Sequence, residues 1–200
     1  MRFTILLFIG WTSSLLLFSC KEGKEHQQKE DTVTFFPLRE LIMGDVKDIV
    51  QTPYLLVAYT ITDNRKDSII IDTTDVKVWA ERFLQKDFND PAWKAQFNEA
   101  VFNDQTTQTY TLSYTTKDAN IPLKQADITA EENSNKVKRI FVRHQWLSGD
   151  TVYFTNGVWK PGKSFWISTT KKFQDTVTQT QLNYIKWNDN SPLPLLSNDR

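Results

Sequence analysis

From about Ala100 to Trp187 the sequence repeats one pattern, in which apolar and polar residues alternate with a period of two. This period places successive side chains on opposite faces of a strand, whereas a helix needs a period near 3.6. Short turn-rich connections separate the alternating segments, which is the spacing of hairpins. We therefore predict strands over residues 108–116, 123–131, 137–147, 150–155, 164–173 and 176–187.

Helical spacing comes earlier in the chain. Residues 35–51 carry apolar side chains on one helical face, and residues 73–84 repeat this spacing more cleanly, with Thr73 or Thr74 as the N-cap. A hairpin over residues 54–72 joins the two. Helices followed by strands are typical of the α+β class. We expect N-terminal helices packed on a mostly antiparallel, meander-like β-sheet that is curved or half-barrel in shape.

The N-terminus predicts export. Arg2 precedes an uncharged, largely apolar run that ends at Cys20, as in a secretory signal peptide. The run is shorter than the ~20 apolar residues that a membrane-spanning helix needs, and Gly10 and three hydroxyl residues interrupt it. We therefore prefer a cleaved signal peptide to a transmembrane anchor.

The end of this run, Leu17-Phe18-Ser19-Cys20, resembles the lipobox of bacterial lipoproteins. The resemblance implies cleavage after Ser19, diacylation of the Cys20 sulfur by fatty acids such as palmitate, and acylation of the new amino terminus. Two or more acyl chains hold a protein stably at a membrane. The resemblance thus implies a lipid-anchored protein of the cell envelope, with membrane contact through Cys20. Lys21 favours the outer membrane under the enterobacterial sorting rule, and the periplasmic and surface faces both remain open.

These features divide the chain into a signal peptide (1–19), a lipidated cysteine with a polar tether (20–32), a single α+β domain (33–190) and an irregular tail (191–200). Cys20 is the one cysteine, so none is left for a disulfide, a zinc site or a nucleophile. Basic and acidic residues number 24 each, and loss of Arg2 with the leader leaves a formal charge of −1. The chain has no excess of basic residues, so its charge gives no indication of a nucleic-acid partner.

One string, Gly157 to Ser164 (GVWKPGKS), matches the P-loop pattern G-x-x-x-x-G-K-[ST]. A working P-loop presents backbone N–H groups and opens a helix, but Pro161 has no N–H and a β-type segment follows Ser164. Pro161-Gly162 instead favours a type II turn. We expect no nucleotide and no other cofactor here. The pattern also places Trp159 opposite Trp166, as a cross-strand pair that either packs in the core or forms an exposed aromatic platform.

Other polar residues offer few sites. His144 lies in phase with Ile140, Val142 and Trp146, and without a second histidine in the domain it is interpreted as structural. No metal site is expected, because Asp63, Asn64 and Asp67 suit a hairpin turn better than a calcium loop. Arg139, Phe141 and Arg143 alternate onto the opposite face. They are a candidate contact for an anion, a glycan or an envelope protein, although a solvated sheet face has the same pattern.

No nucleophile motif or carboxylate pair supports an enzyme. We expect a non-catalytic binding or assembly module held at the envelope, acting through a sheet face or the aromatic hairpin. The alternative is a carrier of a hydrophobic ligand or lipid in a half-barrel cavity. An internal apolar cavity would favour the carrier, and a filled core with an exposed aromatic or basic patch would favour the module.

Overall fold

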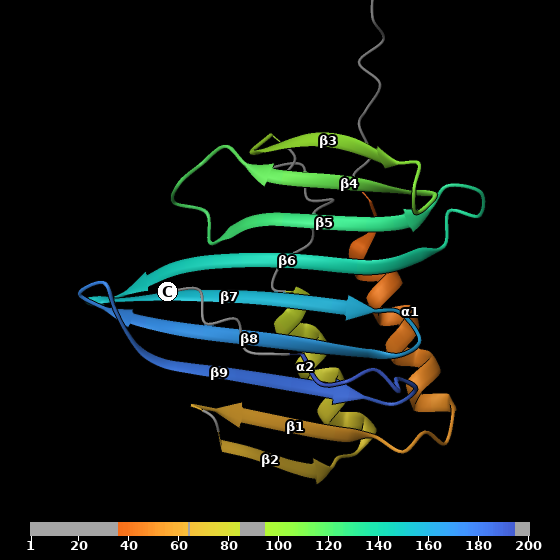
Figure 1. The fold of residues 1–200 in the computed structure, drawn as a ribbon, viewed down its shortest axis with the longest axis horizontal. Helices are drawn as coiled ribbons and strands as arrows, with labels where there is room; N and C mark the ends of the chain where they lie inside the picture. Colours follow the sequence, from red (N-terminus) through yellow and green to blue (C-terminus); the bar gives the residue numbers. More distant parts are fainter. Residues whose placement is uncertain (1–35, 64, 85–94, 195–200) are drawn as a thin grey trace, which may run out of the picture. The chain divides into compact units, whose positions relative to one another are not determined.

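The computed structural model describes residues 36–63, 65–84 and 95–194, all within one compact unit spanning Thr34–Arg200. These residues form a nine-stranded antiparallel sheet and two helices, which confirms the α+β class (Figure 1). The elements are α1 (Leu38–Gln51), β1 (Val57–Thr62), β2 (Arg65–Ile70), α2 (Thr73–Leu84), β3 (Phe97–Asp104), β4 (Thr109–Thr116), β5 (Leu123–Glu131), β6 (Val137–Ser148), β7 (Thr151–Lys160), β8 (Ser164–Phe173) and β9 (Thr176–Lys186).

The strand order is β2-β1-β9-β8-β7-β6-β5-β4-β3. From β3 to β9 each strand pairs with its successor, so the meander predicted from the sequence is confirmed. The N-terminal hairpin β1–β2 joins at the far side, where Val57 pairs with Lys186 of β9. The sheet is open and does not close into a barrel, since β2 and β3 form its two edges.

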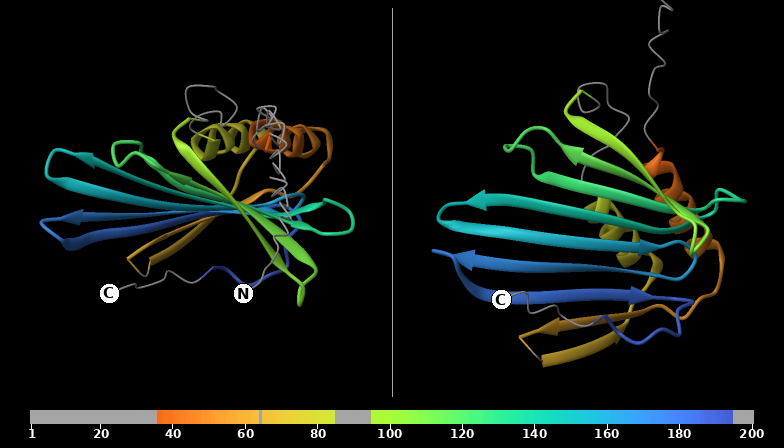
Figure 2. Two further views of the ribbon diagram at one scale, coloured as in Figure 1. Left: turned by 90° about the horizontal axis from the view of Figure 1, so that it is seen from above. Right: turned by 45° about the horizontal axis from the view of Figure 1, so that its top comes forward.

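Both helices cover the same face of the sheet (Figure 2). The apolar stripe of α1 is fully buried and consists of Leu38, Ile42, Val46 and Ile49. Opposite it, one row of paired residues crosses the middle of the sheet: Ile128, Ile140, Trp159, Phe165 and Ile185. All five are at most 1 % exposed. Burial of each such side chain contributes about 1.5–3 kcal/mol, so this row stabilises the packing of α1 on the centre of the sheet.

The N-terminus of α2 differs from the prediction. Asp72 is the cap, because its Oδ1 accepts the N–H groups of Thr74 at 2.7 Å and Asp75 at 3.1 Å. Asp75 Oδ2 in turn accepts the Asp72 N–H at 3.3 Å. This reciprocal arrangement satisfies three amides that would otherwise lack partners at the helix start. The sequence had favoured Thr73 or Thr74, which lie inside the first turn.

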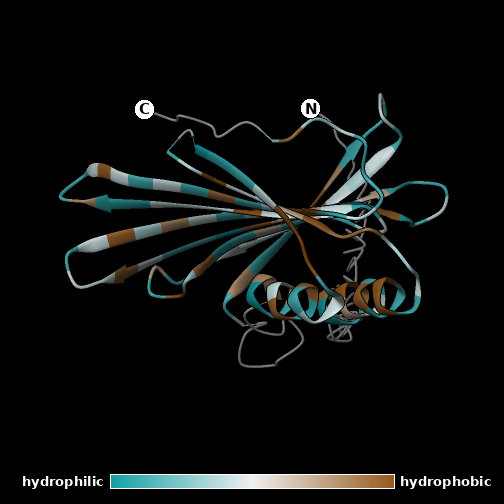
Figure 3. Cartoon of the chain, turned by 90° about the horizontal axis from the view of Figure 1, so that it is seen from below, coloured by the Kyte–Doolittle hydropathy of each residue, from teal (hydrophilic) through white to brown (hydrophobic). Residues whose placement is uncertain are grey.

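Hydrophilic and hydrophobic residues follow one another along the strands (Figure 3), and successive side chains of a strand lie on opposite faces of the sheet. We call the face under α1 and α2 the helix face, and the other the open face. After β9 the chain turns back onto the open face, where Asp189 is 7 % exposed. Its Oδ2 accepts hydrogen bonds from Ser164 Oγ at 2.6 Å and Tyr184 Oη at 3.1 Å, and Lys160 Nζ lies 3.4 Å away. The segment after β9 is therefore attached to the sheet.

Candidate functional site

A cavity of about 470 Å³ lies between α2 and the helix face of β6–β9. The core row of large apolar residues fills the space under α1, but two further rows of the same face have smaller or polar side chains. The cavity is within the size range of small-molecule sites, which is about 300–1,000 Å³. It is the candidate site of the described residues.

The floor of the cavity is built from two rows of paired residues, each crossing β6, β7, β8 and β9. The first row continues the core and consists of Val142, Gly157, Ile167 and Asn183. The second row consists of His144, Thr155, Thr169 and Gln181. Rows of this kind lie roughly 7 Å apart along the strands and their members roughly 5 Å apart across them. The floor thus changes from apolar to hydrogen-bonding over one row.

His144 is a buried titratable residue on the floor of the cavity. Its side chain is 3 % exposed, and its Nδ1 has no hydrogen-bond partner among the described residues. Burial lowers the pKa of the imidazole to about 4, so it is neutral at physiological pH. A buried polar atom without a partner costs about 1–3 kcal/mol and is rare in folded proteins. The sequence correctly placed His144 on the core face, and Trp187 Nε1 is a second buried nitrogen without a partner among the described residues.

The other polar floor groups have donors and acceptors in reserve. The Thr155 and Thr169 hydroxyl oxygens are 3.3 Å apart and share one hydrogen bond. Asn183 Oδ1 accepts from Thr60 Oγ1 at 3.3 Å, which leaves its amide nitrogen for another acceptor. Gln181 completes the row. Among the described residues that line the cavity there is no carboxylate.

Aromatic side chains form the walls. Trp79 and Phe83 come from α2, and Trp146 comes from the next row of β6, where its indole stacks on Tyr153 with ring centroids 5.2 Å apart. The Arg82 guanidinium lies over the Trp79 ring, 4.8 Å from its centroid, and also lines the cavity. Trp79 is partly buried and packs against the core cluster.

Gly157 brings α2 close to the sheet at the inner end of the cavity. A Cβ at this position would lie 2.7 Å from Phe83 Cε2 and 3.0 Å from Val142 Cγ2. The edge of the Phe83 ring thus occupies the space of the missing side chain, and the same ring packs against Trp159 with centroids 5.7 Å apart. This glycine is needed for close approach of helix and strand.

The P-loop-like string is a strand, a turn and a strand, as predicted. The Lys163 N–H donates to the Lys160 carbonyl at 3.0 Å, and Gly162 has a φ of +71°, which a type II turn requires. Ser164 is 1 % exposed and donates to Asp189. The residues of the string therefore serve packing, the turn and attachment of the segment after β9.

The predicted pair of Trp159 and Trp166 is wrong. Lys160 pairs with Ser164, so three residues connect β7 and β8, and Trp159 lies opposite Phe165. These two rings stack with centroids 4.6 Å apart, and Trp159 is fully buried. Trp166 pairs with Val158 on the open face and is partly buried. A connection longer by one residue than a two-residue turn sends the two indoles to opposite faces.

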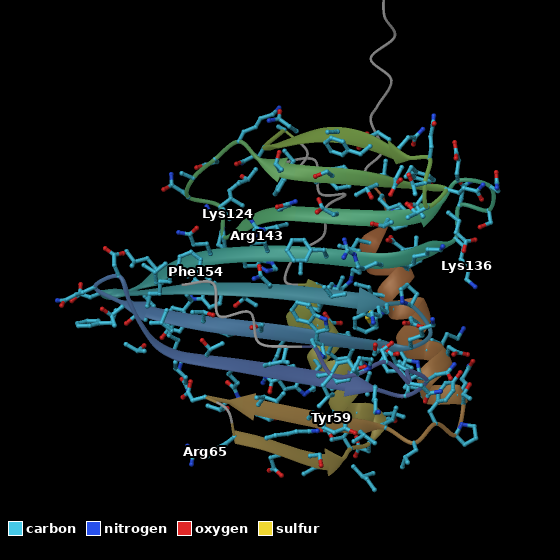
Figure 4. All side chains as sticks on the ribbon, viewed as in Figure 1. Tyr59, Arg65, Lys124, Lys136, Arg143 and Phe154 are labelled. Carbon is cyan, nitrogen blue, oxygen red and sulfur yellow. The ribbon has the colours of Figure 1, made fainter. Side chains whose placement is uncertain are left out.

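The open face gathers the other candidate contacts. Arg139 and Arg143 are exposed there, and the Arg143 guanidinium lies 5.6 Å from the centroid of the Phe141 ring. Phe141, Val158 and Trp166 form one row across β6, β7 and β8, so Trp166 joins this group and Trp159 does not. Figure 4 looks onto this face, with Arg143 among its labelled residues. These residues remain a predicted contact surface.

Cys20 and the remaining residues of the leader and tether lie outside the described ranges. Within those ranges, neither helix has the length and apolar character needed to cross a membrane. The same residues contain no cluster of three His, Cys, Asp or Glu side chains that could hold a metal ion.

Sequence reasoning missed most of the cavity, namely Trp79, Arg82, Thr155, Thr169, Gln181 and Asn183. One signal was present: along β7, β8 and β9 the positions in phase with the core become threonine, asparagine and glutamine away from Trp159, Phe165 and Ile185. Polar residues in a core-facing phase indicate either a solvated end of a sheet or a lined cavity. The position of α2 over these residues, which the sequence does not give, makes them the lining of a cavity and not a solvated end of the sheet.

No protein family, curated protein or solved structure matches the chain.

Proposed function

We propose that this protein is a lipid-anchored, non-catalytic binding module of the bacterial cell envelope, and that its cavity holds a small, ring-shaped polar ligand. The observation that carries the proposal is the row of neutral hydrogen-bonding side chains on the cavity floor, His144, Thr155, Thr169 and Gln181. Ligand hydroxyls over this row would find donors and acceptors in Thr169, Gln181 and the neighbouring Asn183.

The mixture of lining residues supports a ligand that is flat and apolar on its faces and polar at its edge. Trp79 and Trp146 offer aromatic surface, while Thr169, Gln181 and Asn183 offer hydrogen bonds. A saccharide ring has this character, because its C–H faces stack on indoles and its hydroxyls point outward. The two threonine hydroxyls bond each other and not His144, so no activated nucleophile is assembled among them.

The alternative function is a carrier of a hydrophobic ligand. Phe83, Val142 and Ile167 would favour it, since they form one apolar end of the cavity. An acyl chain over the second row, however, would remove water from His144, Gln181 and the threonines without replacing their hydrogen bonds. Each such loss costs about 1–3 kcal/mol, which disfavours the carrier.

Ligand binding is tested with the full-length acylated protein in lipid nanodiscs, using tryptophan fluorescence, because Trp79 and Trp146 line the site. Galactose and related sugars are titrated against wild type, with palmitate in parallel. Thr169→Val removes one floor hydroxyl at nearly constant volume and is expected to weaken sugar binding about five-fold. Thr170→Val, one residue along on the open face, is the control and should bind like wild type. Palmitate binding without sugar binding would establish the carrier instead.

The anchor is tested separately. Cys20→Ala should abolish metabolic labelling of the protein with palmitate and leave the leader uncleaved. Acylation that persists in this variant would contradict the lipoprotein assignment, whatever the outcome of the ligand titrations.

A further inference from the structure

We infer that the ligand is an acidic sugar, a ring bearing both hydroxyls and a carboxylate, and that Arg82 binds the carboxylate. This inference rests on the proposed function and narrows its ligand class. It is carried by the position and the free hydrogen-bonding capacity of Arg82 on the wall opposite the polar row.

Arg82 has no ion-pair partner among the described residues. The three ion pairs found there join Arg39 to Glu81, Lys138 to Glu131, and Lys160 to Asp189. Glu81 is next to Arg82 in sequence, but both of its oxygens accept from Arg39 Nη2 on α1, at 3.0 and 3.1 Å. The nearest carboxylate in sequence is therefore committed to joining the two helices and does not neutralise Arg82.

Stacking on Trp79 prepares Arg82 for an anion. Residues three apart on a helix lie on the same side, and the guanidinium is held 4.8 Å from the Trp79 centroid. A guanidinium that contacts an aromatic face still has N–H donors at its edge, and their fork matches the two oxygens of a carboxylate. Because the side chain is already positioned, less conformational entropy is lost when the anion binds.

The charge of the cavity lining also favours an anionic ligand. His144 is neutral, and among the described residues that line the cavity none is acidic and Arg82 is the one charged group. A cationic ligand would therefore meet repulsion without compensation, and a singly negative one is complementary. The carboxylate would lie at the α2 wall, while the hydroxyls of the same ring reach Gln181 and the Asn183 amide on the floor. Hexuronates such as galacturonate have groups of both kinds on one ring.

The test compares galacturonate with galactose, which differ at one carbon, on the full-length acylated protein in nanodiscs at fixed ionic strength. Wild type should bind galacturonate about ten-fold more tightly, as expected for a charge-assisted hydrogen bond. Arg82→Gln should reduce this preference to about two-fold or less while galactose binding stays unchanged. Arg82→Lys should retain an intermediate preference, since it keeps the charge but loses the fork.

Lys77→Gln is the matched control: Lys77 and Arg82 are both exposed residues of α2, but Lys77 is not among the residues that line the cavity. It should keep the full preference for galacturonate. Unchanged near-ultraviolet circular dichroism of Arg82→Gln would show that α2 remains in place; if it changes, Arg82→Lys alone decides the comparison.

The outcomes separate the two proposals. Equal binding of galactose and galacturonate would overturn the acidic class and leave the proposed saccharide site standing. Binding of benzoate in an Arg82-dependent manner, without galacturonate, would overturn the sugar and retain the anion contact. If neither sugar nor benzoate binds, both the acidic class and the proposed function fail.

Discussion

Trp159 donates its indole N–H to Asp45 Oδ2 at 2.7 Å, and this bond ties the buried centre of the sheet to α1. The other oxygen of Asp45 accepts the Gly162 N–H at 2.9 Å, so one carboxylate bonds both β7 and the turn that follows it. Burial raises the pKa of Asp45, and the two donated hydrogen bonds offset part of this effect. The turn that resembles a phosphate-binding loop therefore presents its glycine N–H to a carboxylate of the same chain.

Trp159→Phe should lower the free energy of unfolding by about 1–3 kcal/mol, because it leaves one oxygen of a largely buried carboxylate without its donor. Urea unfolding of the full-length protein measures the change. Trp166→Phe is the control, since it removes the same atoms from the open face and should shift stability by less than ~1 kcal/mol. Equal effects of the two substitutions would show that the bond to Asp45 contributes little.

Gly157→Ala should destabilise the protein by about 1–3 kcal/mol, because the added methyl group overlaps the Phe83 ring and α2 must move. Gly44→Ala is the opposite case. A Cβ at Gly44 meets nothing within 4 Å, and alanine within α1 should stabilise by about 0.5–1 kcal/mol. Thermal unfolding of both variants gives the comparison. If Gly157→Ala were neutral, close contact between Phe83 and the β7 backbone would be ruled out.

Stability should fall as pH decreases from about 6.5 to about 4. Burial lowers the pKa of His144 from 6.5 to about 4 in the folded protein, so in this window the unfolded chain takes up a proton that the folded protein does not. The free energy of unfolding should fall by roughly 3 kcal/mol across this window, and this contribution should not change with pH above about 6.5. His144→Gln should remove this part of the pH dependence, as measured by urea unfolding at several pH values. Parallel profiles for wild type and variant would contradict a neutral buried imidazole.

Asp189→Asn should lower the free energy of unfolding by about 1.5–3 kcal/mol at pH 7, since it weakens charge-assisted hydrogen bonds from Ser164 and Tyr184. Burial acts to raise the pKa of Asp189, but hydrogen bonds from Ser164 and Ser191 and the charge of Lys160 outweigh it and hold this pKa below its ordinary value. The stabilisation is present above about pH 4 and is lost as pH falls through the lowered pKa.

Wild type and Asp189→Asn should therefore converge in stability at strongly acidic pH. Asp150→Asn, in the exposed turn after β6, is the control and should be neutral throughout. A difference between wild type and Asp189→Asn that persisted in acid would mean that the carboxylate acts through packing and not through its charge.

Period-two alternation located the strands well where both faces were clearly distinguished. The predicted bounds of β5 and β8 agree with the structure, because each ends at a turn rich in glycine or polar residues. β3 was not predicted as a separate strand, since Ala100, Val101 and Phe102 are consecutive and seven of its eight residues are exposed. An edge strand has no buried face to impose the alternation, so its own sequence carries little signal.

The candidate site was less predictable than the fold for two reasons. The predicted pairing of Trp159 with Trp166 failed because a difference of one residue in the connection exchanges the faces, and the sequence does not fix that length. The cavity was not predicted because its residues are distant in sequence. Arg82 and Trp79 of α2 and His144 of β6 line one cavity only through tertiary packing. The sequence predicted the face of the helix or strand on which each residue lies, but it did not predict which residues lie opposite one another across the cavity.

The strand order has a consequence for how this chain can become a folded protein. The hairpin β1–β2 is synthesised before β3–β8, yet the strand on which it docks, β9, follows all of these. Val57 pairs with Lys186, which lies more than a hundred residues later in the chain, and contacts of such sequence separation form slowly. An incomplete chain therefore exposes β1 as an unpaired edge with Tyr59 and Ile61 unprotected. A chain of this topology therefore keeps an edge open to pairing with other strands until β9 is complete.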